Sequence, residues 1–144
     1  MTMKQLSDQI ISIGKKENKG VSNLQLQKVL YFVIGDYIKE NGIDSFIENV
    51  YDEKMEAWQY GPVLRTQYFD NKIFGSMNIK REVEYNENLT VFDEFIKKRI
   101  HENLGDLIDE SHTHPKWKEN EDIIMNQGKV FYELEDFRDV FQSK

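Results

Sequence analysis

The chain has 144 residues and a formal net charge of −7, and 31% of its residues are charged. It contains no cysteine, which excludes disulfides, thiolate metal sites and a cysteine nucleophile. Aromatic residues make up 12% of the chain, which argues against disorder, because disordered chains lack the large side chains whose burial offsets ordering entropy. The basic residues are scattered among acids, so a phosphate backbone would be repelled and direct nucleic-acid binding is not expected.

The length predicts one domain over residues 1–144. Polar residues interrupt the N-terminal segment every few positions, which is unlike the apolar core of a signal peptide. No stretch approaches the ~20 apolar residues that a membrane-spanning helix needs. We therefore expect a cytoplasmic protein that does not enter the membrane.

Two helical patterns occupy the first part of the chain. Apolar residues at helical spacing predict a helix over residues 4–16. Ser22 and Gln25 then indicate a capping box, in which each side chain would satisfy the other residue's backbone N–H. Residues 29–34 are apolar on every side, so this second helix is predicted to be central and packed by neighbours on most faces. Gly42 is predicted to end it.

The middle of the chain predicts a helix and a strand. Pro62 suits the first position of a helix, where its missing N–H is no loss, and it predicts a helix over residues 62–74 that Gly75 ends. Apolar and polar side chains alternate over residues 78–85 and predict a strand. That strand would pair with a short extended piece over residues 55–58.

Helical patterns return in the last third of the chain. Thr90 followed by Asp93 is typical of a helix start, and apolar spacing predicts further helices over residues 105–111 and 129–141. The sequence therefore predicts a mainly α fold. We expect a single compact domain of about five or six helices with room for one small β-hairpin.

The sequence offers no pattern that favours catalysis. His112 and His114 are two positions apart, which is not the i, i+4 spacing that places two metal ligands on one helical face. Pro115 biases His114 away from helix, so the segment is predicted to be a turn that ends a helix. The chain also lacks a nucleophile elbow and a phosphate-binding glycine loop. We therefore predict no enzyme, no cofactor and no catalytic, cofactor-binding or metal-ligating residue.

The stretch Trp58-Gln59-Tyr60-Gly61-Pro62 places two large aromatic residues beside a rigid turn. Trp and Tyr in such a place either fill a corner of the core or anchor an interface, where both types are enriched. Trp117 poses the same choice. The sequence leaves both interpretations open.

Three stretches together resemble the Panacea domain, the SocA-like antitoxin family. Residues 22–32, SNLQLQKVLYF, are similar to its N-terminal LQKLLYF block, and residues 56–63, EAWQYGPV, are similar to its EAWxYGPV signature. Residues 111–118, SHTHPKWK, resemble its SHxxPxW block. The blocks come in the family's order and span most of the chain. The motif residues they carry here are Ser22, Gln25, Leu30, Tyr31, Phe32, Trp58, Gly61 and Pro62.

The resemblance implies an antitoxin that neutralises a toxin protein by direct binding, in a bacterial, prophage or phage toxin–antitoxin system. We expect Tyr60, Arg65, His114 and Trp117 to contact the partner. The acidic charge favours a basic partner surface through electrostatic steering. The alternative is a phage-encoded inhibitor of a host defence protein, such as an anti-CRISPR-type blocker. The oligomeric state, and a role as a proteolytic adaptor, stay open.

Overall fold

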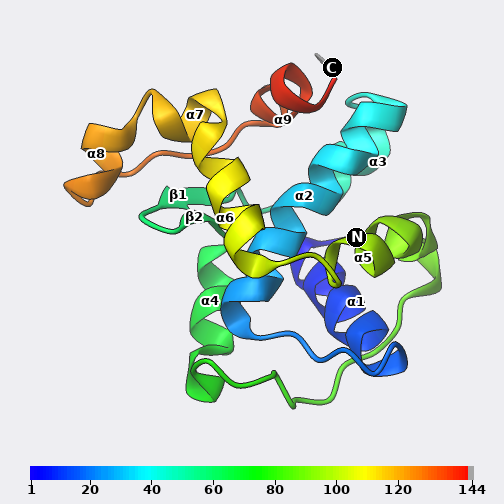
Figure 1. Cartoon of the computed structure of the whole chain (residues 1–144). Coiled ribbons are helices and arrows are strands. Elements are labelled where there is room, and N and C mark those ends of the chain that lie inside the picture. The colour runs from blue at the N-terminus through cyan, green and yellow to red at the C-terminus, as the bar shows by residue number, and fades with distance from the viewer. Residues whose placement is uncertain (143–144) are drawn as a thin grey trace.

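The computed structural model describes residues 1–142 and has a mainly helical fold with one small antiparallel sheet (Figure 1). Within that part of the chain the α-helices are α1 (Met3–Lys16), α2 (Asn23–Asn41), α3 (Ser45–Val50), α4 (Arg65–Asp70), α5 (Asp93–Arg99), α6 (Leu104–Thr113), α7 (Pro115–Lys118), α8 (Glu121–Met125) and α9 (Leu134–Phe141). The strands are β1 (Glu56–Trp58) and β2 (Gly61–Val63), and the short 3-10 helices are η1 (Lys72–Phe74) and η2 (Glu87–Phe92). The mainly α prediction is confirmed, with more and shorter helices than expected.

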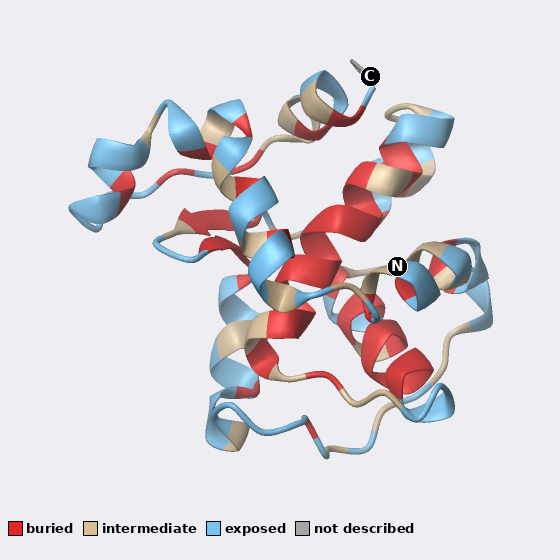
Figure 2. Cartoon of the chain, in the orientation of Figure 1, coloured by how far each residue is buried: buried red, intermediate tan, exposed pale blue. Residues whose placement is uncertain are grey.

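Helix α2 is the centre of the fold, as its all-round apolar sequence predicts. It runs through the middle of the molecule, and nearly all of it is buried (Figures 1 and 2). Helices α1 and α5 pack against it, as do α9, α6, α4 and β2. Each large apolar side chain buried in this way contributes about 1.5–3 kcal/mol. The helix ends at Gly42, which has the positive φ of 73° that glycine accommodates.

The start of α2 forms only half of the predicted capping box. The Ser22 hydroxyl accepts a hydrogen bond from the Gln25 backbone N–H, at 3.2 Å. The Gln25 amide does not return to Ser22 and instead donates to the carbonyl oxygen of Ile100, at 3.0 Å. The prediction of a reciprocal bond is therefore wrong, because the Gln25 amide donates instead to a buried carbonyl just beyond the end of α5.

The hairpin follows from a tight turn at Gly61. β1 pairs with β2 so that Ala57 lies opposite Pro62. The other edge of β1 is taken by the chain around Val130, whose carbonyl oxygen accepts from the Ala57 N–H at 2.8 Å. The predicted helix over residues 62–74 is wrong at its start: Pro62 lies in β2, and α4 begins at Arg65. A short strand at the edge of a sheet tolerates proline, because no ladder bond needs its missing N–H.

The predicted strand over residues 78–85 does not form. The segment is extended, but apart from one isolated bridge between Asn78 and Ser22 it has no ladder partner among the described residues. The side chain of Arg81 holds it instead. Its guanidinium binds Asp8 at 2.8 Å, and it also donates to Asn71 and Gln67. The segment with alternating apolar and polar residues is therefore held by side-chain hydrogen bonds and an ion pair, and not by pairing with a second strand.

The C-terminal helix is shorter than predicted. Residues 130–132 run extended beside β1, and the Tyr132 N–H donates to the Met55 carbonyl oxygen at 2.9 Å. Helix α9 therefore begins only at Leu134 and packs Phe137 and Phe141 onto α2. Among residues 1–142, no helix is both long enough and apolar enough to cross a bilayer.

Candidate protein-binding face

The first and second sequence blocks meet where the start of α2 lies beneath the hairpin. The Nζ of Lys28 donates to the carbonyl oxygen of Pro62 at 2.8 Å. The Gln27 side-chain oxygen accepts from the Leu64 N–H at 2.7 Å, and the Asn23 amide donates to the Tyr68 carbonyl oxygen at 2.9 Å. Polar side chains of α2 therefore hold both β2 and α4 in place.

The third block fixes the other half of the hairpin. The Trp117 indole N–H donates to the carbonyl oxygen of Trp58 at 2.8 Å. The His112 ring stacks on Trp117 with a centroid distance of 3.9 Å, and its Nε2 hydrogen-bonds the Gln59 carbonyl oxygen at 3.1 Å. Because a carbonyl oxygen only accepts, Nε2 carries the proton in this bond. The turn between the strands is thus tied to α6 and α7 through its backbone.

Gly61 allows these blocks to approach so closely. Its φ is 101°, which side chains with a Cβ rarely adopt. A Cβ built there would lie 2.6 Å from Ser111 Oγ and 3.3 Å from Lys28 Cε. The glycine of the second block is therefore required by both backbone conformation and space.

Lys28 is buried without a carboxylate partner among the residues that the structure describes. Its side chain is 0% exposed, and this loss of hydration lowers the pKa of its amine from 10.5 to about 7. The Pro62 carbonyl oxygen is the hydrogen-bond acceptor it contacts. The amine lies under the hairpin with no opening to solvent, so it supports the turn rather than facing a ligand.

The four residues predicted to contact a partner divide into two pairs. Tyr60 is 59% exposed at the tip of the hairpin, and Arg65 is exposed on the first turn of α4. His114 and Trp117 are only 4% and 6% exposed. The latter two lie beneath the surface, and Trp117 positions the hairpin from below. Contact of Tyr60 and Arg65 with a partner stays a prediction.

His114 belongs to a buried aromatic cluster. Its Nδ1 lies 2.6 Å from the hydroxyl of Tyr31, a residue of the first block. Burial raises the pKa of Tyr31 well above its usual range. The rings of Phe32, Phe137 and Phe141 lie within 6.0 Å of Tyr31, centroid to centroid. The predicted end of a helix at His114 is present: α6 ends at Thr113, and His114 has a non-helical backbone that separates α6 from α7.

The two neighbouring histidines do not converge on a metal site. His112 faces the hairpin turn, whereas His114 faces Tyr31 in the core. Across residues 1–142 no group of three or more histidine, aspartate and glutamate side chains is placed to hold a metal ion.

Around the hairpin, aromatic and apolar side chains gather on the surface. Trp58 packs edge-on against Tyr68 with a centroid distance of 5.1 Å, and Tyr68 packs against Phe69 at 5.4 Å. Phe69 is 47% exposed, and Ile73 on the following turn is 87% exposed. We call this surface the hairpin face and define it by Trp58, Gln59, Tyr60, Arg65, Phe69, Lys72, Ile73, Met125 and Lys129.

Two cations of the hairpin face lie over the same ring. The Arg65 guanidinium is 5.2 Å and the Lys72 ammonium 5.7 Å from the centroid of Phe69. The helical spacing of these residues, at i, i+4 and i+7, puts them on one side of α4 and η1. Such cation–π contacts are worth about 0.5–1 kcal/mol at exposed sites and leave the charges open to a ligand.

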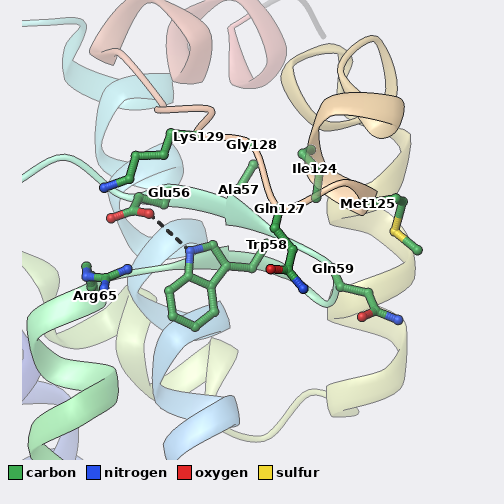
Figure 3. A pocket seen from close by; sticks show the side chains of 10 residues that line it. All are labelled: Glu56, Ala57, Trp58, Gln59, Arg65, Ile124, Met125, Gln127, Gly128 and Lys129. Atoms are coloured by element: carbon green, nitrogen blue, oxygen red, sulfur yellow. Dashed lines mark hydrogen bonds between the residues drawn. The ribbon is translucent and has the colours of Figure 1, made fainter.

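The hairpin face contains two hollows on either side of Trp58. The first, about 420 Å³, lies between β1 and α8 (Figure 3). At one end of it Arg65 and Lys129 lie below and above Glu56, and at the other end are Gln59 and Met125. The second hollow, about 660 Å³, lies between the hairpin, α4 and the start of α2. It is lined by Asn23, Leu24, Trp58, Gln59, Tyr60, Val63, Tyr68, Lys72, Gly75 and Ser76.

Sequence reasoning named Arg65 of α4 but missed the contributions of Phe69, η1 and α8 to this face. Phe69 and Ile73 are four positions apart, a spacing that ordinarily predicts a face turned to the core. Here both side chains point outward. The available signal was the pair of cations that flank Phe69 in the sequence. Comparison of the chain with protein-family models, curated proteins and solved structures found no match.

Proposed function

We propose that the chain is a non-catalytic, antitoxin-like protein-binding domain of the Panacea type, which neutralises a toxin by covering it with the hairpin face. The observation that carries the proposal is the exposure of Tyr60, Phe69 and Ile73 on the hairpin face, whose hairpin backbone is held from both sides. The three stretches that resemble the family meet at this hairpin, which agrees with a shared role.

The composition of the face suits a protein partner. Tyr, Trp and Arg dominate the energetics of protein interfaces, and all three types are present in Trp58, Tyr60 and Arg65. Soluble monomers rarely expose large contiguous apolar patches, and those that do often use them for binding. Met77, four positions after Ile73, is also exposed, at 61%. A surface of this kind gains free energy when a partner removes it from water.

The rigidity of the hairpin also favours tight binding. Lys28 and Gln27 hold β2 from one side, and Trp117 and His112 hold the turn from the other. A preorganised surface loses little conformational entropy on binding, so more of the contact energy appears as affinity.

The experiment that tests the proposal combines capture and rescue. The tagged full chain is purified from cells of the organism that encodes it, and associated proteins are identified by mass spectrometry. The gene of each captured protein is then expressed alone and together with this chain. We expect one captured protein that arrests growth alone and is harmless when the chain is present.

Surface variants link that rescue to the hairpin face. Tyr60→Ala and Ile73→Asp change exposed side chains and leave the core intact, so the chain folds while binding and rescue weaken. Lys98→Glu on α5 is the matched surface control and keeps full rescue. Capture of a host defence nuclease that the chain inhibits would replace the antitoxin proposal with the inhibitor alternative. A captured protein without toxicity, or no specific capture, would reject neutralisation of a toxin.

A further inference from the structure

The hairpin face carries cations without acidic partners, and this bears on what it binds. Arg81, Arg99 and Arg138 each form an ion pair with a carboxylate, at 2.8, 2.7 and 3.4 Å respectively. Among residues 1–142, Arg65 forms none, and neither do Lys72 and Lys129 of the same face. Apart from Glu56 in the first hollow, the residues that define this face and line its two hollows are neutral or cationic, in a chain whose net charge is −7.

We propose that the hairpin face binds an extended segment of the partner in which a large apolar side chain is flanked by carboxylates. This inference rests on the proposed protein-binding function and specifies the chemistry of the bound segment. The basic surface expected from long-range steering then lies elsewhere on the partner, because the net charge of the chain and the charge of this face have opposite signs.

The apolar side chain belongs in the second hollow. It is lined by Trp58, Tyr60 and Tyr68, together with the half-buried Leu24 near the start of α2. Its volume of about 660 Å³ accommodates an aromatic or large aliphatic group. Burial of such a side chain would supply about 1.5–3 kcal/mol.

The carboxylates would meet the cations at the edges of the two hollows. Lys72 lines the second hollow, and Arg65 and Lys129 line the first. The Phe69 ring beneath Arg65 and Lys72 restricts both side chains before a ligand arrives. In the first hollow, Glu56 already accepts a hydrogen bond from the Trp58 indole at 3.2 Å, so a carboxylate there would approach Arg65 and Lys129 from their exposed sides.

The two hollows share Trp58 and Gln59. A segment that crosses Trp58 and Gln59 has to place side chains in the hollows on both sides of them. An extended chain can do this, because every second side chain points to the same face. A helix would present its side chains along one line instead. If a second copy of this chain bound here through the same face, cations would lie opposite cations. Cations without an ion-pair partner therefore favour an acidic segment of a different protein.

The test uses the full chain and synthetic peptides. One short peptide places an aspartate two positions before and two positions after a central phenylalanine, so that all three side chains lie on one side of the extended chain, and two matched peptides carry asparagine or lysine in place of each aspartate. Binding is followed by the indole N–H signals of Trp58 and Trp117 in a ¹H–¹⁵N spectrum. We expect the acidic peptide to shift the Trp58 signal more than the buried Trp117 signal, and to bind about tenfold more tightly than the lysine peptide.

Charge-reversal variants identify the residues responsible. Arg65→Glu combined with Lys72→Glu is expected to weaken the acidic peptide by about tenfold and to reverse the preference in favour of the lysine peptide. Lys39→Glu combined with Lys98→Glu changes the net charge equally on exposed residues of α2 and α5 and leaves the preference intact. Added salt should reduce the difference between the peptides, because exposed charges are screened.

The outcomes separate this inference from the proposed function. Absence of binding by the acidic peptide, equal binding of all three peptides, or shifts confined to signals outside the hairpin face would overturn it. So would a dimer of the chain that the Arg65 and Lys72 reversals dissociate. If the captured toxin is still neutralised by the charge-reversed chain, the antitoxin proposal stands and the acidic-segment inference fails.

Discussion

The Nζ of Lys28 lies 2.8 Å from the carbonyl oxygen of Pro62 and donates a hydrogen bond to it in the interior of the protein. The pair joins the central helix to the hairpin across 34 positions of sequence. A buried lysine without a carboxylate partner is a rare arrangement, because removing an ammonium group from water is costly. Its effect is therefore measurable as a dependence of stability on pH.

Replacement of Lys28 by Met should flatten that dependence. The pKa of the amine is about 7 when folded and 10.5 when unfolded, so between these values the unfolded chain binds more protons at this site. The free energy of unfolding then rises with pH by up to about 1.4 kcal/mol per unit, and below about pH 7 the slope vanishes because both states are protonated. Urea denaturation across this range, kept below the tyrosine pKa, measures the slope.

The exposed Lys98→Met variant serves as the control and should keep the wild-type slope. Lys28→Met also leaves the Pro62 carbonyl without its donor, at a cost of about 1–3 kcal/mol. The decisive quantity is the change with pH rather than the value at one pH. Identical slopes in the wild type and Lys28→Met would show that Lys28 is not desolvated.

Gly61→Ala should be strongly destabilising. The new methyl group would meet Ser111 Oγ at 2.6 Å, and the φ of 101° is unfavourable for alanine. Together these effects predict a loss of about 2–4 kcal/mol in the free energy of unfolding, measured by urea denaturation. Gly75→Ala is the matched comparison, since Gly75 also has a positive φ but no neighbour within 4 Å. It should lose less than Gly61→Ala, because only the backbone conformation of φ 58° and ψ −129° opposes alanine there, and equal losses would mean that close packing at Gly61 is unimportant.

Gly35→Ala tests the docking of α9 on α2. In an open helix this change stabilises by about 1 kcal/mol, because alanine is the better helix former. Here the added Cβ would lie 2.3 Å from the ring of Phe141, so we expect a net loss of about 1–3 kcal/mol. Thermal or urea unfolding of the single variants and the double variant forms a cycle with Phe141→Ala. If the ring is the obstacle, Gly35→Ala becomes neutral or stabilising once Phe141 is truncated.

Trp117→Phe should weaken both the fold and the binding face. The phenyl ring cannot donate to the Trp58 carbonyl oxygen, and it stacks less area on His112. We expect a loss of about 1–2 kcal/mol in stability, measured by denaturation. We also expect the folded molecules of this variant to bind the partner more weakly. Trp58→Phe provides the contrast: its half-buried side chain contributes less to the core, so binding should fall with a smaller loss of stability. The reverse order would place Trp117, and not Trp58, in the interface.

The parts of the fold that sequence patterns predicted are those specified by local signals. Helix α2 has a cap at Ser22, a long apolar run and a stop at Gly42, and all three act within a few residues. Pro62 is compatible with a helix start and with a short edge strand. The choice depends on Ala57 opposite and Lys28 beneath it, which the local pattern does not contain.

The candidate site was predictable only in part for the same reason. The aromatic stretch at Trp58 and Tyr60 indicated either a core or an interface role, and the structure gives each residue a different exposure. His114 lies in the core, where its Nδ1 hydrogen-bonds the hydroxyl of Tyr31, 83 positions away. Phe69 faces outward, whereas Gln67 of α4 and Asn71 just after it are buried and accept hydrogen bonds from Arg81. Only the assembled tertiary structure brings these partners together.

The strands of the hairpin are three residues long and have little cohesion of their own. The bonds that hold them reach 34 positions back to Lys28 and 59 positions forward to Trp117. During synthesis the support from Lys28 is therefore available as soon as the strands emerge, whereas the support from Trp117 is missing until residue 117 has left the ribosome. A partner that recognises the hairpin face would be bound after translation of this segment, and nascent chains stalled before it would not compete for that partner.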